Sequence, residues 1–314
     1  MDIFRHYTGL PASARGGVVA IGNFDGIHLG HQFVIAKAGE LAQASGAKQT
    51  VLTFEPHPRS VFQPDLPPFR LTPFRVKAEL LRSLGIAVLY NLHFDLEFAA
   101  LSAEDFVRDV LVAGLGISEA VVGYDFVFGH RRHGDAALLT RMGKALGFGV
   151  TILEPVQQGS EIYSSTRIRH LLVEGKPRAA AALLGRAWEI DGRVEQGDRR
   201  GRTIGFPTAN IELADYLRPA AGVYAVRAAI GRDGAWLDGV ANFGRRPTFD
   251  GSDLRLEVHL FDFAGDLYGR HLRVALVDYL RPEQKFAGLD ALKAQIAADA
   301  AQARAILAAA PPTV

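Results

Sequence analysis

The 314-residue sequence contains no cysteine. Disulfide bonds, thiolate nucleophiles and cysteine-bound zinc are therefore excluded, and the absence fits a reducing cytosol. The sequence also lacks an excess of charge of either sign. It has 35 lysines and arginines and 34 acidic residues, which gives a formal net charge of +1. That balance argues against a nucleic-acid-binding protein that relies on a large basic surface.

Long apolar runs are also missing. No segment holds 18 consecutive apolar residues, so we expect no membrane-spanning helix. The N-terminus "MDIFRHYTGL" has no basic start followed by an apolar run, unlike a secretory signal. A GxxxxGK(S/T) loop is absent, which argues against a Walker-type kinase. We therefore expect a cytoplasmic protein.

The first half of the chain alternates strand-like and helix-like runs. Apolar, β-branched runs occupy 16–24, 48–58, 86–94, 119–129 and 148–156. Runs with helical spacing lie between them, at 32–46, 75–85, 102–116 and 135–147. This alternation predicts an α/β domain with a parallel sheet covered on both faces, whose ligands bind at the carboxyl ends of the strands.

The texture changes near residues 184–186. Two helical runs, 165–175 and 177–185, are followed by short strand-like runs separated by Gly, Asp and Pro, up to residue 281. Regular short strands without helices between them predict a small antiparallel barrel, and 288–310 predicts a closing helix. We therefore expect two domains, 1–184 and 185–314.

The stretch "IGNFDGIHLGHQ", residues 21–32, lies between the first predicted strand and its helix. Free N–H groups and the helix dipole favour anions there, and His28 and His31 can donate hydrogen bonds to phosphate oxygens. Gly22, Gly26 and Gly30 let a bulky ligand approach the backbone. Two other interpretations stay open. A metal site is disfavoured by the spacing of three without a glutamate, and both histidines could be structural.

A second phosphate-ready helix start follows in "YSSTRIRHLL", residues 163–172. Hydroxyl groups, free N–H groups and guanidinium groups gather there, contributed by Ser164, Ser165, Thr166, Arg167 and Arg169. A capped helix with a solvated basic face is the simpler alternative. Two such starts in one α/β unit favour a polyphosphate ligand.

These motifs resemble those of a known family. "GNFDGIHLGH" and "SSTRIR" resemble the two signatures of HxGH nucleotidyltransferases, and "TFEPHPR" with "GYDFVFGHRRHGD" resembles the adenylyltransferase module of bacterial bifunctional riboflavin kinase/FAD synthetases. The resemblance implies a Rossmann-like domain that transfers AMP from ATP to FMN and releases pyrophosphate.

The same resemblance assigns roles to residues. His28 and His31 would contact the ATP phosphates, and Ser164, Ser165, Thr166 and Arg167 would hold the departing pyrophosphate. The remaining ATP-side residues would be Gly22, Asn23, Asp25 and Gly30. Asp125, Phe126 and Phe128 would shape the FMN or adenine pocket, with core packing as the alternative for the two rings. Val127 departs from the basic residue expected there, which puts one flavin or phosphate contact in doubt.

The second half carries "GDRRGRTIGFPTANIEL", residues 197–213. Gly201 and Gly205 make a loop flexible enough to wrap a nucleotide, and Thr208 and Asn210 offer oxygen ligands to a magnesium ion that bridges phosphates. Turn chemistry after Pro207 is the alternative for that pair. Arg200 and Arg202 could approach ATP phosphates or remain solvated.

"GRTIGFPTAN", "GVANFGRRPTF" and "LRLEVHLFDFAGDLYGRHLRV" resemble, in order, the blocks of riboflavin kinases, which are six-stranded barrels. The resemblance makes Glu257 the base at the riboflavin hydroxyl and places Asn242 and Arg246 on the flavin side. Period-two alternation puts Glu257 and His259 on one strand face. A surface glutamate is the alternative.

The two sets of motifs together span essentially the whole chain. They imply a bifunctional enzyme whose small-molecule partners are riboflavin, FMN, FAD and ATP with Mg²⁺, without nucleic acid or membrane; homo-oligomerisation stays open. Three rivals remain: an adenylyltransferase for a nicotinamide or pantetheine nucleotide with an inert barrel, a flavin-binding regulatory protein, and an RNA-binding barrel. The intact blocks around Asn210 and Glu257, and the net charge, argue against them.

Overall fold

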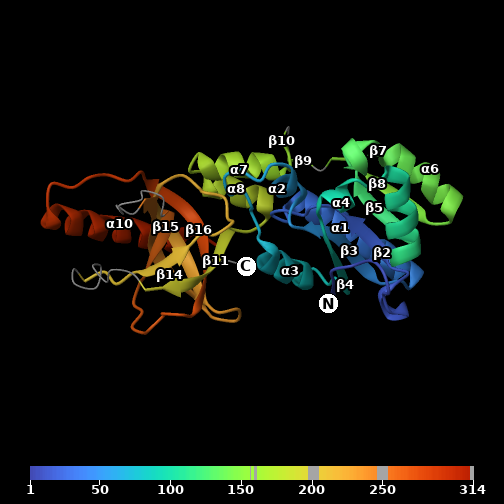
Figure 1. Cartoon of the computed structure of the whole chain (residues 1–314). Helices are drawn as coiled ribbons and strands as arrows, with labels where there is room; N and C mark the ends of the chain where they lie inside the picture. Colours follow the sequence, from blue (N-terminus) through green and yellow to red (C-terminus); the bar gives the residue numbers. More distant parts are fainter. Residues whose placement is uncertain (156, 159–160, 197–204, 246–253, 312–314) are drawn as a thin grey trace. The chain divides into compact units, whose positions relative to one another are not determined.

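The computed structural model describes residues 1–155, 157–158, 161–196, 205–245 and 254–311 (Figure 1). The chain forms two compact units, and each is described by itself. Unit 1 comprises Met1–Pro67 and Thr72–Ser164, and unit 2 comprises Pro68–Leu71 and Ser165–Val314. Residues 165–184, which precede the expected domain boundary, therefore belong to unit 2. The division into functional domains at residue 184 stays a prediction.

Unit 1 is built on a six-stranded sheet in the order β1-β4-β3-β2-β5-β8, and every pair is parallel. Its strands are β1 (Asp2–Phe4), β2 (Val18–Ile21), β3 (Gln49–Glu55), β4 (Val88–His93), β5 (Glu119–Gly123) and β8 (Gly149–Leu153). Two short hairpins are β6 (Val127–Phe128) with β7 (Gly134–Asp135), and β9 (Gln157–Gln158) with β10 (Glu161–Ile162). The parallel α/β prediction is confirmed.

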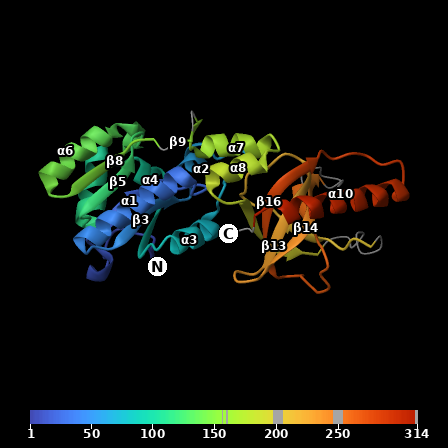
Figure 2. The ribbon, with the colours of Figure 1, turned by 180° about the vertical axis from the view of Figure 1, so that it is seen from behind.

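Helices cover both faces of this sheet (Figures 1 and 2). The helices of unit 1 are η1 (Ala12–Ala14), α1 (Leu29–Ser45), α2 (Pro58–Phe62), α3 (Phe74–Ser83), α4 (Leu96–Ala99), α5 (Ala103–Asp105), η2 (Phe106–Leu115), η3 (His130–Arg132) and α6 (Ala136–Leu146). On one face Val18 and Ala20 of β2 pack with α1 and α3, and on the other Val19 and Ile21 pack with η2 and α6. Strand alternation thus divides one strand between two cores.

Two local features of unit 1 differ from the sequence-based expectation. β1 was not predicted, because three residues carry no readable periodicity; it pairs with β4 through Ile3 and Leu89. Helix α1 begins at Leu29, three residues before the expected start. The reason is that His28 caps the helix with its ring, which sequence rules assign to Ser, Thr, Asp or Asn.

Unit 2 contains the closed six-stranded antiparallel barrel β11-β12-β15-β14-β13-β16, as predicted. Its elements are α7 (Ser165–Val173), α8 (Pro177–Leu184), β11 (Trp188–Glu195), β12 (Ala209–Glu212), β13 (Gly222–Ile230), β14 (Trp236–Arg245), β15 (Leu254–Leu260), β16 (His271–Arg281) and α10 (Leu289–Ala309). Apolar residues of α10, including Ala303 and Leu307, pack on Val223 and Ala225 of β13. The closing helix expected at 288–310 is confirmed.

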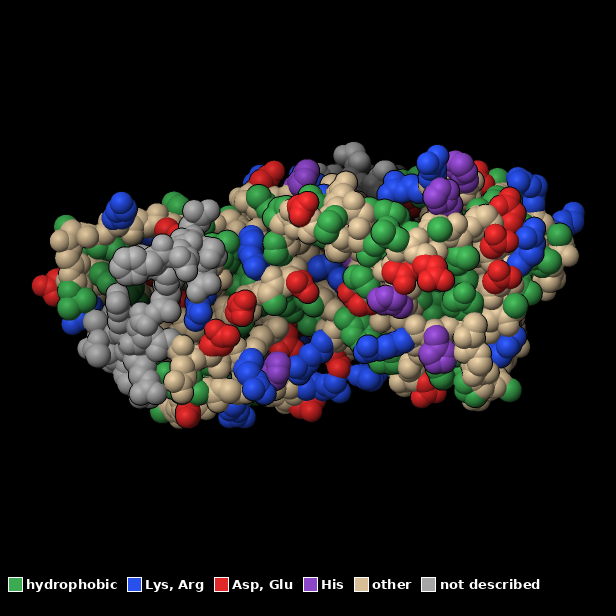
Figure 3. Space-filling model, viewed as in Figure 1, with side chains coloured by type: hydrophobic (Ala, Val, Ile, Leu, Met, Phe, Trp, Pro, Cys, Tyr) green, Lys and Arg blue, Asp and Glu red, His purple; other side chains and the backbone are tan. Residues whose placement is uncertain are grey.

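A buried ion pair fastens α10 to the barrel. Asp299 is only 3% exposed and accepts hydrogen bonds from Arg281, from Nε at 2.9 and 3.2 Å and from Nη2 at 2.7 Å. Among the described residues, no helix is long and apolar enough to cross a bilayer. On the face seen in Figure 3, basic and acidic side chains are interspersed, in keeping with the balanced composition.

Candidate functional site

The sheet of unit 1 reverses its strand order between β2 and β5, since β3 and β4 continue on one side of β2 and β8 lies beyond β5. Ligands of open α/β sheets bind at the carboxyl ends of the strands at such a switch point. The segment Gly22–His31 follows β2, and Tyr124–Phe128 follows β5. Two of the sequence motifs therefore leave neighbouring strands at the edge where a nucleotide is expected.

His28 and His31 form one small aromatic stack at the start of α1. The Nδ1 atom of His28 accepts a hydrogen bond from the backbone N–H of His31 at 3.3 Å. The two rings stack with centroids 3.6 Å apart, and the Phe24 ring meets His31 edge-on at 5.2 Å. For Nδ1 of His28 to accept this bond, we assign the ring N–H to Nε2. That N–H is a donor suited to a phosphate oxygen.

Gly30 lies between His28 and the chain leading to the second motif. A Cβ at position 30 would be 3.2 Å from the Cε1 and Nδ1 atoms of His28 and 3.2 Å from the Cβ of Tyr163. Tyr163 directly precedes Ser164, so unit 1 brings the start of the second motif beside the first. A side chain at position 30 would therefore crowd protein atoms even before a ligand binds.

Replacement of Gly30 by alanine should therefore lower activity without lowering stability. Alanine favours a helix over glycine by about 1 kcal/mol, whereas its methyl group must push both the His28 ring and the Cβ of Tyr163 by a few tenths of an ångström. We expect roughly a tenfold loss in the rate of the reaction predicted for His28, with an unchanged or higher melting temperature. Steady-state rates and thermal unfolding test this, and a falling melting temperature would contradict it.

The neighbouring polar residues of the turn are engaged by the protein. Asp25 is 2% exposed, and its Oδ1 atom accepts hydrogen bonds from the backbone N–H of Thr72 at 2.9 Å and from its hydroxyl at 3.3 Å. The backbone oxygen of Asn23 accepts from Lys77 and Thr53. A Cβ at Gly22 would meet the Phe24 ring at 3.2 Å. Gly22 thus makes room for a ring of the turn itself.

The second phosphate motif is divided between the units: Ser164 ends unit 1, and Ser165, Thr166 and Arg167 begin α7 in unit 2. Thr166 is exposed and Arg167 is half-buried. Arg169 has another partner, because its Nε atom donates to the backbone oxygen of Phe69 at 2.9 Å and its guanidinium lies over the Phe69 ring. This contact ties Arg169 to Phe69, and its contribution to the anion site stays a prediction.

The segment after β5 combines core and surface residues. Phe128 is 8% exposed and packs in the core of unit 1 with Phe106, at 5.5 Å between ring centroids. Phe126 stacks on Phe128 at 5.2 Å and is partly buried against that core. Asp125 and Val127 are exposed. Phe128 thus packs in the core and Phe126 packs partly against it, as the alternative for the two rings holds. A contact of either ring with a flavin stays a prediction.

Unit 2 aligns three expected site residues on adjacent strands. In the barrel register, Glu257 of β15 lies directly opposite Asn210 of β12 and also opposite Asn242 of β14. Opposing residues share a sheet face with Cβ atoms about 5 Å apart, so the three side chains form one polar row. Leu256, Val258 and Leu260 are buried, whereas Glu257 and His259 lie on the other face, as the alternation predicted.

Two contacts support this row. The Nδ1 atom of His259 is 2.8 Å from the backbone oxygen of Pro207, the residue before Thr208. The side-chain amide of Asn242 donates to Glu283 at 3.2 Å. Sequence reasoning missed Glu283, although its charge directly after the last barrel strand, in "RPEQKF", was a signal. Gly201, Arg246, Arg200 and Arg202 lie outside the described residues.

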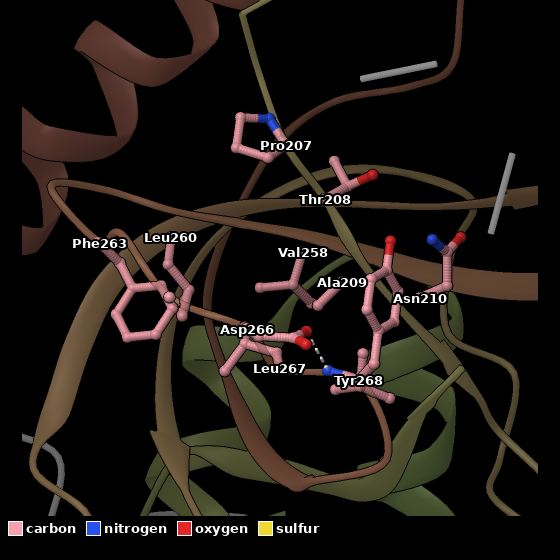
Figure 4. A pocket seen from close by; sticks show the side chains of 12 residues that line it. Pro207, Thr208, Ala209, Asn210, Val258, Leu260, Phe263, Asp266, Leu267 and Tyr268 are labelled. Carbon is pink, nitrogen blue, oxygen red and sulfur yellow. Dashed lines mark hydrogen bonds between the residues drawn. The ribbon is translucent and has the colours of Figure 1, made fainter. Parts of the chain in front are cut away.

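A pocket opens in unit 2 beside Thr208 and Asn210 (Figure 4). It is lined by Val194, Pro207, Thr208, Ala209, Asn210, Val258, Leu260, Phe263, Gly265, Asp266, Leu267 and Tyr268. Asp266 accepts a hydrogen bond from the backbone N–H of Tyr268 at 3.0 Å, which braces the loop after β15. The sequence analysis included this loop in the block "LRLEVHLFDFAGDLYGRHLRV" but assigned none of its residues to a site. Its mixture of apolar side chains and a few polar groups is typical of a ligand pocket.

The residues predicted to bind a metal ion, Thr208 and Asn210, both carry oxygen donors. Within the part of the chain that the structure describes, no group of three His, Cys, Asp or Glu residues is placed to hold a metal ion. Thr208 and Asn210, two residues apart at the start of β12, both line the pocket. A hydroxyl and an amide oxygen fit a Mg²⁺ ion that takes its other ligands from phosphates and water.

Comparison with known proteins adds an independent finding. A family model described as FAD synthetase matches residues 10–167, and one described as riboflavin kinase matches residues 184–307. The bifunctional riboflavin kinase/FMN adenylyltransferase of Escherichia coli strain K12 is 44% identical over 93% of this chain and 93% of its own. That of Pseudomonas fluorescens is 43% identical over 98% of both chains.

A solved structure is similar throughout the chain as well. The protein titled macrolide-efflux protein from Streptococcus pneumoniae superposes with a TM-score of 0.85 at 33% identity, covering 95% of this chain and 96% of that one. The relative from Bacillus subtilis strain 168, another bifunctional riboflavin kinase/FMN adenylyltransferase, is 40% identical over 91% of both chains. The same domain pair therefore recurs along essentially the full length.

Proposed function

This chain belongs to the family of bifunctional riboflavin kinase/FMN adenylyltransferases, and from that premise we propose which residues carry each reaction. The enzyme phosphorylates riboflavin with ATP to give FMN, and it transfers AMP from ATP to FMN to give FAD and pyrophosphate. The observation that supports the division of labour is that each of the two expected sets of site residues gathers locally: His28 with His31, and Asn210 with Glu257 and Asn242.

For AMP transfer, we propose that catalysis consists of positioning and charge stabilisation. The FMN phosphate attacks the α-phosphorus of ATP in line, and pyrophosphate leaves. The Nε2–H of His28 and the ring of His31 donate to phosphate oxygens as charge builds up, and the start of α1 adds its dipole. Ser164, Ser165, Thr166 and Arg167 hold the pyrophosphate, and Asp125, Phe126 and Phe128 border the FMN site.

For phosphoryl transfer, we propose that Glu257 accepts the proton of the ribityl 5′-hydroxyl as that oxygen attacks the γ-phosphorus. Asn242 lies beside Glu257 and orients the flavin side. Thr208 and Asn210 contribute oxygen ligands to the Mg²⁺ ion that ATP brings, and the pocket next to them accepts the nucleotide. Bound Mg²⁺ neutralises phosphate charge; the protein supplies orientation.

One incubation tests this proposal. Purified protein mixed with riboflavin, ATP and Mg²⁺ should give FMN and then FAD, which chromatography separates. Supplying FMN in place of riboflavin should give FAD directly, with one pyrophosphate released per FAD. Absence of both products would overturn the proposal, and FMN without FAD would remove the role of unit 1. Because both reactions consume ATP, the cytoplasm is the compartment that we propose.

A further inference from the structure

A buried lysine that the reactions above leave unassigned lies beside the turn that leads to His28. Lys77 on α3 has 0% exposed surface. Its Nζ atom donates to the backbone oxygen of Asn23 at 2.8 Å and lies 3.4 Å from Oγ1 of Thr53, which itself donates to the same oxygen at 3.1 Å. Burying an ammonium group is costly, so its placement on one carbonyl of this turn calls for a reason.

Thr72, which precedes α3 by two residues, holds the turn at two further points. Its backbone N–H and its hydroxyl both donate to Oδ1 of Asp25, at 2.9 and 3.3 Å. The hydroxyl oxygen also accepts from the backbone N–H of Gly26 at 2.8 Å. Thr72 and Asp25 are each 2% exposed, so water cannot easily replace these bonds. Thr72 and Lys77 together bind three residues of the turn: Asn23, Asp25 and Gly26.

The turn needs such support because its backbone is unfavourable. Phe24 has φ 48° and Ile27 has φ 41°, both in the left-handed region, and Gly26 between them has φ 86°. Left-handed backbone is uncommon for non-glycine residues, and a β-branched isoleucine there is a true outlier. Such strain persists only where surrounding contacts over-determine the conformation, and it clusters at functional sites. The next residue after Ile27 is His28, the cap of α1.

We propose that Thr72 and Lys77 are positioning residues for AMP transfer, an inference that rests on the proposed function. They touch no reacting atom in this scheme. They hold Asn23–Ile27 in its left-handed path, and that path delivers His28 to the start of α1 and stacks it on His31. Asp25 belongs to the same clamp, so its carboxylate acts through the turn.

The sharpest test is a matched pair at position 72. Thr72→Val keeps the shape and removes the hydroxyl, whereas Thr72→Ser keeps the hydroxyl. We expect the valine variant to lose roughly 10- to 100-fold in kcat for FAD formation from FMN, with a much smaller change in KM for FMN. The serine variant should recover most of the rate. Lys77→Met should match the valine variant, and Lys144→Met, an exposed lysine on α6, should match the wild type.

Backbone amide exchange over residues 23–31 provides a readout that needs no reaction. Loss of the Thr72 hydroxyl removes an acceptor that the Gly26 N–H uses at 2.8 Å, so exchange should quicken in Thr72→Val and stay slow in Thr72→Ser. Unchanged exchange together with an unchanged kcat in Thr72→Val would overturn the inference. The inference would also be overturned if kcat fell equally in Thr72→Val and Thr72→Ser and in proportion to a fall in their melting temperatures. That pattern would indicate a structural role alone. If the wild type makes no FAD, but exchange still differs between Thr72→Val and Thr72→Ser, the result counts against the proposed function instead.

Discussion

Replacement of His31 by alanine should abolish FAD formation from FMN while sparing riboflavin phosphorylation. The His31 ring stacks on His28 and meets Phe24 edge-on, at the start of α1. Loss of one donor to a developing phosphate charge costs about 10²–10³-fold in rate, and loss of the stack also frees the His28 ring. We expect the larger of these values. Product chromatography with FMN and with riboflavin as separate substrates measures both reactions in one preparation.

His31 is a better target than His28 for this experiment. The ring of His28 caps α1, so its removal combines a catalytic loss with a loss of roughly 1 kcal/mol of helix stability. The bond that caps the helix uses the backbone N–H of His31, which an alanine retains, so the His31→Ala variant should keep the melting temperature of the wild type within a few degrees. His6→Ala, an exposed histidine of unit 1, is the matched control. Equal loss of both activities in His31→Ala would contradict the assignment of AMP transfer to unit 1.

The sequence predicts the two architectures well because both depend on patterns that repeat. Alternating strand and helix periods specify a parallel sheet, and evenly spaced short strands specify a barrel. Periodicity fails to predict a short element that forms only because it pairs with another strand. β1 has three residues and exists because β4 offers a free edge to Asp2–Phe4. Nothing within those residues indicates a strand.

The candidate sites divide in the same way. His28, His31 and Glu257 belong to recognisable motifs, and motifs are local in sequence. The row of Asn210, Glu257 and Asn242 requires strand register, which pairing in three dimensions decides. Lys77 is the clearest miss. In "RVKAELLRSLG" a lysine is typical of the solvated side of a helix, yet this one is buried against Asn23 and Thr53. Only the packed structure reveals a polar group that has left the surface.

Replacement of Glu257 by glutamine should depress riboflavin phosphorylation and leave FMN adenylylation largely intact. Glutamine has the same size as glutamate and can occupy the place opposite Asn210 and Asn242, so the barrel should fold normally. What disappears is the carboxylate that we propose as the acceptor of the hydroxyl proton. General-base catalysis contributes about 10²–10⁴-fold, and the loss should therefore fall in kcat, with KM for riboflavin changed much less.

The pH dependence separates this role from a merely structural one. A carboxylate base is active only when ionised, so the wild-type rate should fall towards acidic pH, and that acid limb should vanish in Glu257→Gln. Glu212→Gln supplies the control, because Glu212 is exposed on β12, two residues beyond Asn210 on the same strand. Its rate and pH profile should match the wild type. If Glu257→Gln phosphorylates riboflavin at the wild-type rate, the base is another group, and the polar row serves only to orient the substrate.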